Sequence, residues 1–284
     1  MSIKQITNNL MMRVTVLFLA VLLVIQLSFC VCQSADILPF RTKDGNFIRV
    51  KEVTVAADIP QRTNIISWWK FDTTNSPTLE TMGTTNVGVF VSTGRTWIAQ
   101  AKIGGGYDMG TNSQDVANGY FTCGADSSLD ITNRSITISA WIRPAISTRD
   151  YMSVIAKTDS SWVTGYNLFF YGNYPLAGNK TWEFCVNDYT VSGASFKTNI
   201  VDGQWHHIVG TYDGTNVCFY VDYSSYTLAR ASVAYTNQIL TTSNPLRIGK
   251  ATGGYNYWGG MDEVIIWRTA LASNEVKDLY YYGY

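Results

Sequence analysis

The sequence has few of the side chains that most often carry acid–base or metal chemistry. Only two histidines occur in 284 residues, and the formal net charge is zero with no run of Lys and Arg. The even charge argues against nucleic acid and anionic membrane surfaces as partners. The chain also contains neither G-x-S-x-G nor a strand with carboxylates spaced as in E-x-D-x-x-E. A serine hydrolase and a conventional glycosidase are therefore disfavoured.

Residues 1–35 have the pattern of a targeting segment. Two basic residues precede an apolar run at 14–25, and small residues suited to signal-peptide cleavage follow, near Cys32 or Ala35. Alternatively the segment stays as a signal anchor, because 14–32 contains 19 residues of which three are polar. In either case we expect the rest of the chain to be extracellular, either secreted or tethered to the membrane through this segment only.

The remainder divides into a short arm and one large domain. Residues 36–63 are predicted to be a connecting arm, because so short a segment cannot bury a core of its own. In 64–284, short runs rich in Val, Ile, Thr and aromatic residues alternate with clusters of Gly, Asn, Asp and Ser. That alternation is typical of an antiparallel β-sandwich, so the predicted fold class is all-β.

Three runs show a period of two, in which alternate side chains share one face of a strand. The residues expected on the apolar faces are Ile136, Ile138, Ala140 and Ile142 in the first run, Trp182, Phe184 and Val186 in the second, and Val217, Phe219 and Val221 in the third. The C-terminal segment differs: Ser273 is suited to an N-cap, and Val276, Leu279 and Tyr280 have helical spacing. A short C-terminal helix is predicted there.

The two histidines are adjacent, in "GQWHHIVGTYDGTNVCFYVD" at 203–222. This stretch predicts a hairpin whose turn is formed by Asp213 and Gly214. Neighbouring side chains of a strand point to opposite faces, so His206 and His207 are not expected to bind one metal ion together. We expect one to be inward and hydrogen-bonded, and the other to be at the surface.

The hairpin resembles the central W-H-H-V-x-x-T-Y-D-G stretch of the laminin-G-like, concanavalin A-like jelly-roll family. Three other stretches agree with that family in the expected order: "IISWWKFDTT" at 65–74, "DSSLDITNRSITISAWIRP" at 126–144 and "GGMDEVIIWRTALASNEVKDLY" at 259–280. The resemblance implies a jelly-roll sandwich closed by the C-terminal helix. It departs from the family at Tyr223, where a glycine is usual, and over 75–107.

The same resemblance implies a structural calcium ion near the first and last strands. The matching carboxylates are Asp72, in "WWKFD", and Asp262, in "GGMDEV". Carboxylate and carbonyl oxygens are the ligands that Ca²⁺ prefers. The alternative is that Asp72 caps a turn and that Asp262 makes a hydrogen bond.

Some aromatic residues lie where a strand pattern is absent. Trp162, Tyr174, Tyr255, Tyr257 and Trp258 occur among Gly, Ser and Asn in predicted loops. A large ring there has little to pack against unless a ligand binds to it, and flat rings beside polar groups suit sugars. The alternative is that these loops fold onto the sandwich and bury their rings.

Cys123, Cys185 and Cys218 lie outside the leader. An exported chain permits one disulfide and one remaining thiol, but the sequence does not decide between Cys185–Cys218 and a pair that includes Cys123.

These observations, with the family resemblance, predict an exported, noncatalytic recognition module. Its expected partner is an extracellular glycan or protein surface, as in cell adhesion. Two alternatives stay open: a structural envelope module without a dissociable ligand, and a glycan-cleaving enzyme with an atypical site. Apart from calcium, no cofactor is expected.

Overall fold

The computed structural model describes residues 58–74, 82, 85–91, 96–110, 119–145, 151–172, 180–223 and 229–283. They belong to one compact unit that extends from Ala56 to Tyr284. The predicted leader and most of the predicted arm lie outside the described residues. Within those residues, no helix combines the length and the apolar character needed to cross a bilayer.

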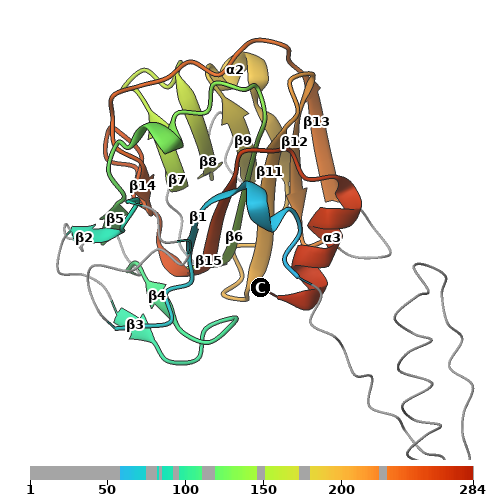
Figure 1. The fold of residues 1–284 in the computed structure, drawn as a ribbon. Coiled ribbons are helices and arrows are strands. Elements are labelled where there is room, and N and C mark those ends of the chain that lie inside the picture. Colours follow the sequence, from blue (N-terminus) through green and yellow to red (C-terminus); the bar gives the residue numbers. More distant parts are fainter. Residues whose placement is uncertain are drawn as a thin grey trace, which may run out of the picture. The chain divides into compact units, whose positions relative to one another are not determined.

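The described residues form two antiparallel sheets packed face to face, which confirms the predicted all-β jelly-roll sandwich (Figure 1). The strands of the eight-stranded sheet are β1 (Ile65–Trp69), β3 (Thr96–Ile98), β4 (Gly106–Asp108), β6 (Ile136–Pro144), β11 (His206–Tyr212), β12 (Asn216–Val221), β13 (Ala229–Ala234) and β15 (Gly259–Trp267). Their spatial order is β13-β12-β11-β6-β15-β4-β3, with β1 also paired to β15.

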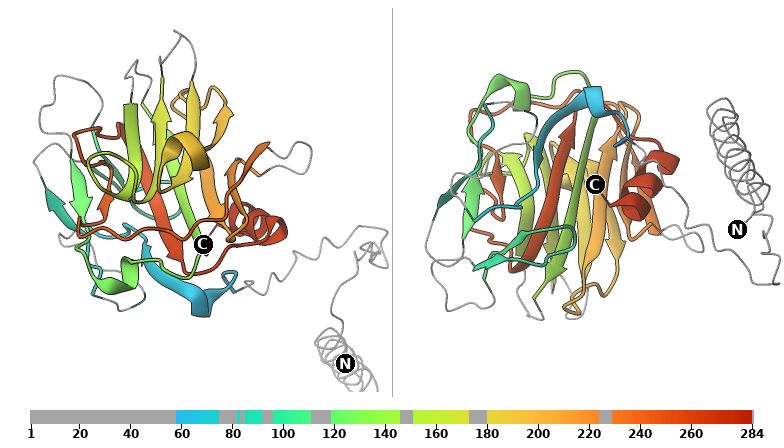
Figure 2. Two further views of the ribbon diagram at one scale, coloured as in Figure 1. Left: turned by 90° about the horizontal axis from the view of Figure 1, so that it is seen from above. Right: turned by 60° about the horizontal axis from the view of Figure 1, so that its bottom comes forward.

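The strands of the seven-stranded sheet are β2 (Val89–Val91), β5 (Tyr120–Thr122), β7 (Tyr151–Thr158), β8 (Gly165–Tyr171), β9 (Thr181–Val186), β10 (Ala194–Lys197) and β14 (Arg247–Ile248). Their order is β10-β9-β8-β7-β14-β5-β2. The short helix α2 (Tyr189–Ser192) connects β9 to β10, and two 3₁₀ turns occur at η1 (Arg62–Asn64) and η2 (Ser127–Leu129). The two views in Figure 2 show the two sheets from above and from below.

The main core lies between the sheets and includes all the side chains that the period-two pattern predicts. The predicted apolar faces of 136–142, 182–186 and 217–221 are all buried in it. The sheets approach closely where β11 crosses β9, because a Cβ on Gly210 would lie 2.1 Å from the ring of Phe184. Glycine at this position therefore makes room for the Phe184 ring between the sheets.

A second, smaller core covers the outer face of the eight-stranded sheet. Helix α3 (Ser273–Tyr282) packs Val276 and Leu279 against residues of β1, β11, β12 and β15. Ile59, in the predicted arm, is buried in this cluster, and the Pro60 carbonyl accepts a hydrogen bond from Trp267 Nε1 at 3.0 Å. This face is therefore not solvated but forms an interior of its own.

The C-terminal helix is confirmed, but its N-cap lies one residue earlier than predicted. Ser273 is the first helical residue and Ala272 occupies the N-cap position. The alanine side chain cannot accept a hydrogen bond, so the Glu275 carboxylate accepts the Ala272 N–H at 2.8 Å instead. A carboxylate in the first turn also interacts favourably with the helix dipole.

The expected disulfide is absent: Cys123, Cys185 and Cys218 are free and buried. The prediction was wrong because the sequence does not show in which layer of the sandwich each cysteine lies. Cys185 lies in β9 on the outer side of the seven-stranded sheet, and Cys218 lies in β12 on the outer side of the other sheet. Cys123 lies in the core between the sheets. The three thiols thus occupy different layers.

Candidate functional site

A cavity of about 410 Å³ lies on the outer side of the seven-stranded sheet. Its lining residues are Tyr151, Ser160, Ser161, Trp162, Phe169, Tyr171, Tyr189 and Tyr255. Strands β7 and β8 supply the floor, and two loops and helix α2 supply the walls. Six of these residues are aromatic and none is charged. We refer to this cavity as the aromatic groove.

Trp162 lies at the centre of the groove and contacts rings from three other segments. Its ring centroid is 5.2 Å from that of Phe169, 5.3 Å from that of Tyr255 and 6.1 Å from that of Tyr189, with interplanar angles of 78°, 87° and 75°. Edge-to-face contacts of this kind stabilise aromatic clusters. Because Trp162 is only half-buried, part of the ring stays open to solvent.

The loop that carries Trp162 is held in a conformation unusual for a tryptophan. Its φ is 59°, in the left-handed region, which costs a residue other than glycine on the order of 1–3 kcal/mol. The Asp159 carboxylate accepts the Val163 N–H at 3.0 Å, and the indole Nε1 donates to the Thr252 carbonyl at 3.3 Å. These hydrogen bonds position the ring at the groove despite the strain.

Tyr255 forms the facing wall. Gly253 and Gly254, with φ of 103° and 98°, allow the chain to turn before it. The Tyr255 carbonyl then accepts the Ser153 N–H of β7 at 3.1 Å, which fixes this loop to the sheet. The Tyr255 ring is 38% exposed and lies 5.3 Å from the Tyr151 ring, so it presents a surface to solvent over the groove.

Tyr171 and Glu183 form the polar end of the groove. The Tyr171 hydroxyl donates to Glu183 Oε2 at 3.0 Å, while Oε1 has no hydrogen-bond partner among the described residues. Burial raises the pKa of Glu183 to about 7, although the Tyr171 hydroxyl acts in the opposite direction. A Cβ on Gly193 would lie 2.1 Å from Oε1, so the backbone closes over the carboxyl group.

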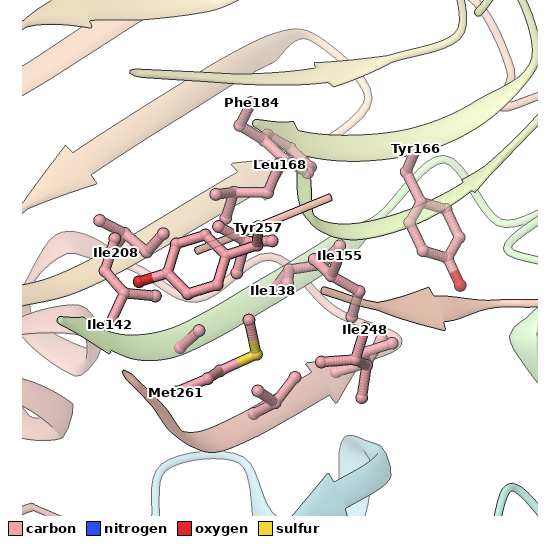
Figure 3. Packing of buried hydrophobic residues seen from close by; sticks show 14 of the residues in the cluster. Ile138, Ile142, Ile155, Tyr166, Leu168, Phe184, Ile208, Ile248, Tyr257 and Met261 are labelled. Atoms are coloured by element: carbon pink, nitrogen blue, oxygen red, sulfur yellow. The ribbon is translucent and has the colours of Figure 1, made fainter. Parts of the chain in front are cut away.

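Trp162 and Tyr255 are thus the predicted aromatic residues that the structure brings together. Tyr174 lies outside the described residues. Tyr257 and Trp258 are 0% and 2% exposed, so their prediction as loop residues open to a ligand was wrong. Figure 3 shows the Tyr257 ring among the core residues Ile142 and Ile208.

Tyr257 and Trp258 are buried because the chain returns to the sandwich core directly after Tyr255. The Tyr257 N–H donates to the Gly249 carbonyl at 2.8 Å and its hydroxyl donates to the Gly260 carbonyl at 3.1 Å. The backbone N–H and the hydroxyl of Tyr257 are therefore both hydrogen-bonded inside the protein.

Sequence reasoning missed Tyr151, Phe169, Tyr171 and Tyr189. A signal for two of them exists in "GYNLFFYG", where Phe169 and Tyr171 alternate with the core residues Leu168 and Phe170. A strand with large rings on both faces indicates that its outer face is also covered or used. No comparable signal marks Tyr189, which is 42% exposed in α2.

The two histidines lie on opposite faces of β11, as predicted. His207 is 2% exposed and its Nε2 lies 2.7 Å from Ser139 Oγ. Burial lowers the pKa of His207 to about 3. His206 points away from it and contacts Asp222, and its Nε2 lies 3.0 Å from Asp202. Burial by itself would lower the pKa of His206, but the two carboxylates raise it.

The predicted calcium ligands lie near each other and anchor one loop. Asp262 Oδ2 accepts the Ile103 N–H at 2.8 Å and Asp72 Oδ1 accepts the Gly105 N–H at 2.9 Å. Burial, with a smaller contribution from the charge of Asp72, raises the pKa of Asp262 to about 7. No group of three or more His, Cys, Asp or Glu side chains suited to a metal exists among the residues described. Calcium binding here stays a prediction.

Comparisons with known proteins agree with this architecture. The model of a family described as the concanavalin A-like lectin/glucanases superfamily, Laminin_G_3, matches residues 114–277, which is more than half of the chain. The match includes strands of both sheets and all lining residues of the aromatic groove. No curated protein matches the chain.

Several solved structures have the same fold at low sequence identity. Domain 4 of AbnA, a GH43 extracellular arabinanase from Geobacillus stearothermophilus solved with arabinotriose, is 16% identical at a TM-score of 0.58, over 76% of this chain and 98% of that one. The binding domain of botulinum neurotoxin DC, in complex with SialylT, is 13% identical at a TM-score of 0.54, over 76% of this chain and 51% of that one. The binding domain of Paraclostridial Mosquitocidal Protein 1 is 16% identical at a TM-score of 0.55, over 77% of this chain and 52% of that one. The chain thus spans about half the length of the two toxin domains.

Proposed function

The chain belongs to the concanavalin A-like lectin/glucanases superfamily, and on this premise we propose that it is a noncatalytic carbohydrate-binding domain. The aromatic groove is the binding site in this proposal. Trp162 and Tyr255 stack on sugar rings, and the hydroxyls of Ser160, Ser161 and Tyr171 form hydrogen bonds with the sugar hydroxyls.

The observation that carries this proposal is the arrangement of the groove. Its solvent-accessible rings come from five separate segments, and the loop of Trp162 holds a strained backbone to place one of them. A sugar ring has apolar C–H faces and polar edges, so it fits a site that combines flat rings with hydroxyl groups. Pockets with mostly apolar walls and a few polar groups are typical of small-ligand sites.

The similar structures support a glycan ligand. One is a domain of an extracellular arabinanase that was solved with arabinotriose, and another belongs to botulinum neurotoxin type C, whose cell entry depends on interaction with two ganglioside molecules. Most of the similar structures are described as binding domains. These comparisons support binding of a carbohydrate without naming the one that this chain binds.

The groove lacks the groups that glycoside hydrolysis requires. Canonical hydrolysis uses two carboxyl groups roughly 5–10 Å apart across the scissile bond, and none of the lining residues is Asp or Glu. Glu183 contacts a lining residue, because one of its oxygens accepts the Tyr171 hydroxyl, while the carboxylates of Asp159 and Asp188 accept backbone N–H groups of their own turns. A binding role therefore fits the described residues better than an enzymatic one.

The proposal includes export and a role at the cell surface. Its support is the sequence of residues 1–35, which resembles a signal peptide or anchor. An extracellular location would give the groove access to glycans of surfaces and matrices, as cell adhesion requires.

A glycan array with matched tryptophan variants tests the proposal. We expect wild-type protein to bind a subset of glycans saturably, and we expect Trp162→Ala and Tyr255→Ala to weaken that binding at least tenfold. Trp205→Ala is the matched control, because Trp205 is also half-buried but stacks with Arg143 on the other sheet.

Equal binding by wild type and Trp162→Ala would contradict the assignment of the groove. Release of sugar products by the purified protein, abolished by Glu183→Gln, would instead establish an enzyme. Melting temperatures of all variants show whether a loss of binding comes from unfolding.

A further inference from the structure

A second hollow, of about 390 Å³, is lined by Lys180, Lys197, Thr198 and Asn199. It lies at the β9–β10 edge of the seven-stranded sheet, whereas the aromatic groove lies over β7 and β8. Lys197 is exposed, and Lys180 Nζ donates to Asn199 Oδ1 at 2.7 Å. Both charges in this lining are positive, in contrast to the uncharged groove.

The register of the sheet places the two hollows on one row. Tyr151 pairs with Tyr171, Tyr171 pairs with Thr181, and Thr181 pairs with Lys197. Directly paired residues of antiparallel strands point to the same face. Adjacent strands lie about 4.8 Å apart, so the row from Tyr151 to Lys197 is roughly 14 Å long. An extended chain lying along this row meets the aromatic groove first and the lysines last.

Tyr171 connects the two hollows. It lines the aromatic groove, and its hydroxyl interacts with Glu183 of β9, with Thr181 and with Ser195 of β10. Its side chain therefore leans from β8 toward the lysine hollow. Tyr171 thus lies between the aromatic groove and the two strands at whose ends the lysine hollow is formed.

Charges of both signs lie around the aromatic end. The Asp159 carboxylate accepts the Val163 N–H, and Arg247 donates to Thr252, whose carbonyl accepts the Trp162 indole. The lining of the other hollow has two lysines and no carboxylate. An anionic group would be attracted there rather than in the uncharged groove.

From these observations we propose that the lysine hollow is a subsite for an anionic sugar substituent, a carboxylate or a sulfate. The inference rests on the proposed function and deepens it: the ligand is an oligosaccharide whose uncharged rings occupy the aromatic groove and whose acidic group reaches Lys180 and Lys197. The lysine ammonium groups form charge-assisted hydrogen bonds with the anion. The separate positions of the uncharged groove and the two lysines give the bound chain one orientation.

Matched glycan pairs test this subsite. The probes are neutral xylo-oligosaccharides with and without a glucuronate substituent, lactosamine glycans with and without sulfate, and hydroxyethylcellulose against carboxymethylcellulose. We expect wild type to favour the acidic member of at least one pair by about tenfold, and we expect Lys180→Gln/Lys197→Gln to remove that preference while leaving binding of the neutral member unchanged. Added salt should reduce the preference in the same way.

Lys102→Gln/Lys277→Gln is the matched control, because it removes the same charge from lysines that contact rings elsewhere, Trp141 and Tyr281. A preference that both double variants reduce equally would show a general charge effect and overturn the subsite. Equal binding of both members of every pair, with binding still lost in Trp162→Ala, would overturn the subsite and leave the proposed function intact.

Two further outcomes separate the proposals. Binding of acidic glycans that survives Trp162→Ala but is lost in Lys180→Gln/Lys197→Gln would support the lysine subsite and contradict the aromatic groove. Failure of the wild type to bind any neutral or acidic probe would contradict both.

Discussion

The outer faces of the two sheets differ, although the same alternation of side chains produces both. On the eight-stranded sheet, α3 and the segment around Ile59 cover the outward residues, and a second core results. On the seven-stranded sheet, two loops and α2 cover the outward residues only in part, and the aromatic groove results. The covering segments, rather than the strands, decide which face is an interior and which is available to a ligand.

The polar residues of the two faces show the same difference. Under α3, His207 contacts Ser139, and Glu263 accepts a hydrogen bond from Trp68 Nε1. Ser139, His207 and Glu263, with Trp141, Ile265 and Leu279, line a space too small to hold a water molecule. They lie inside the protein, where Glu263 Oε1 has no hydrogen-bond partner among the described residues. The hydroxyls of Tyr171 and the groove serines lie where a ligand can reach them.

Leu279→Ala tests the covered face by removing part of its packing. Leu279 is 3% exposed in the α3 core, so we expect the free energy of unfolding to fall by about 3 kcal/mol. Glycan binding should stay unchanged. Urea denaturation measures the effect, and Leu240→Ala is the control because Leu240 is 53% exposed. A similar loss in both variants would contradict an interior under α3.

His207 should make the covered face sensitive to acid. Burial lowers the pKa of His207 from 6.5 to about 3, so the unfolded state binds the additional proton between these values. This contribution to stability is therefore complete above pH 6.5 and is lost as the pH falls toward 3, by up to about 4–5 kcal/mol. His207→Phe should flatten the pH dependence relative to wild type, and parallel pH curves of the two proteins would contradict this.

Glu183, beside the groove, should make stability depend on pH in the opposite direction. Its pKa is raised from 4.5 to about 7, so the folded state binds the additional proton and stability falls as the pH rises from 4.5 to 7. We expect Glu183→Gln to reduce this fall by up to about 3 kcal/mol. Part of the slope should remain, because Asp262 titrates in the same range. Tyr171→Phe should steepen the fall, since it removes the hydroxyl that lowers the pKa of Glu183.

Removal of calcium should have the smallest effect on stability of these changes. If a cation lies between Asp72 and Asp262, it relieves the repulsion that contributes to the raised pKa of Asp262. EDTA should then lower the melting temperature by a few degrees, Ca²⁺ should restore it, and Asp262→Asn should abolish the response. A melt that does not respond to EDTA, with metal-free protein shown by elemental analysis, would remove the calcium proposal.

The sequence predicted the sandwich because its signals are local. Period-two runs place Ile138, Phe184 and Phe219 in the core whatever the distant segments do. The same reasoning placed the two histidines on opposite faces. It did not give the layers of the cysteines, because strand order depends on contacts between distant segments.

The candidate site was predictable only in part, for the same reason. Trp162 and Tyr255 were found because Gly- and Ser-rich surroundings rarely bury a ring. Tyr257 lies two residues further along and is buried, since the chain returns to the core between them. Phe169 and Tyr171 belong to a strand, and no local pattern shows which outward face a distant segment covers.

A crystal structure of the protein with an oligosaccharide selected on the array tests the central claim most directly. We predict a sugar ring stacked against Trp162 and Tyr255, within hydrogen-bond distance of the Tyr171 hydroxyl. A sugar bound on the eight-stranded sheet, or at a rim remote from Trp162, would contradict the account.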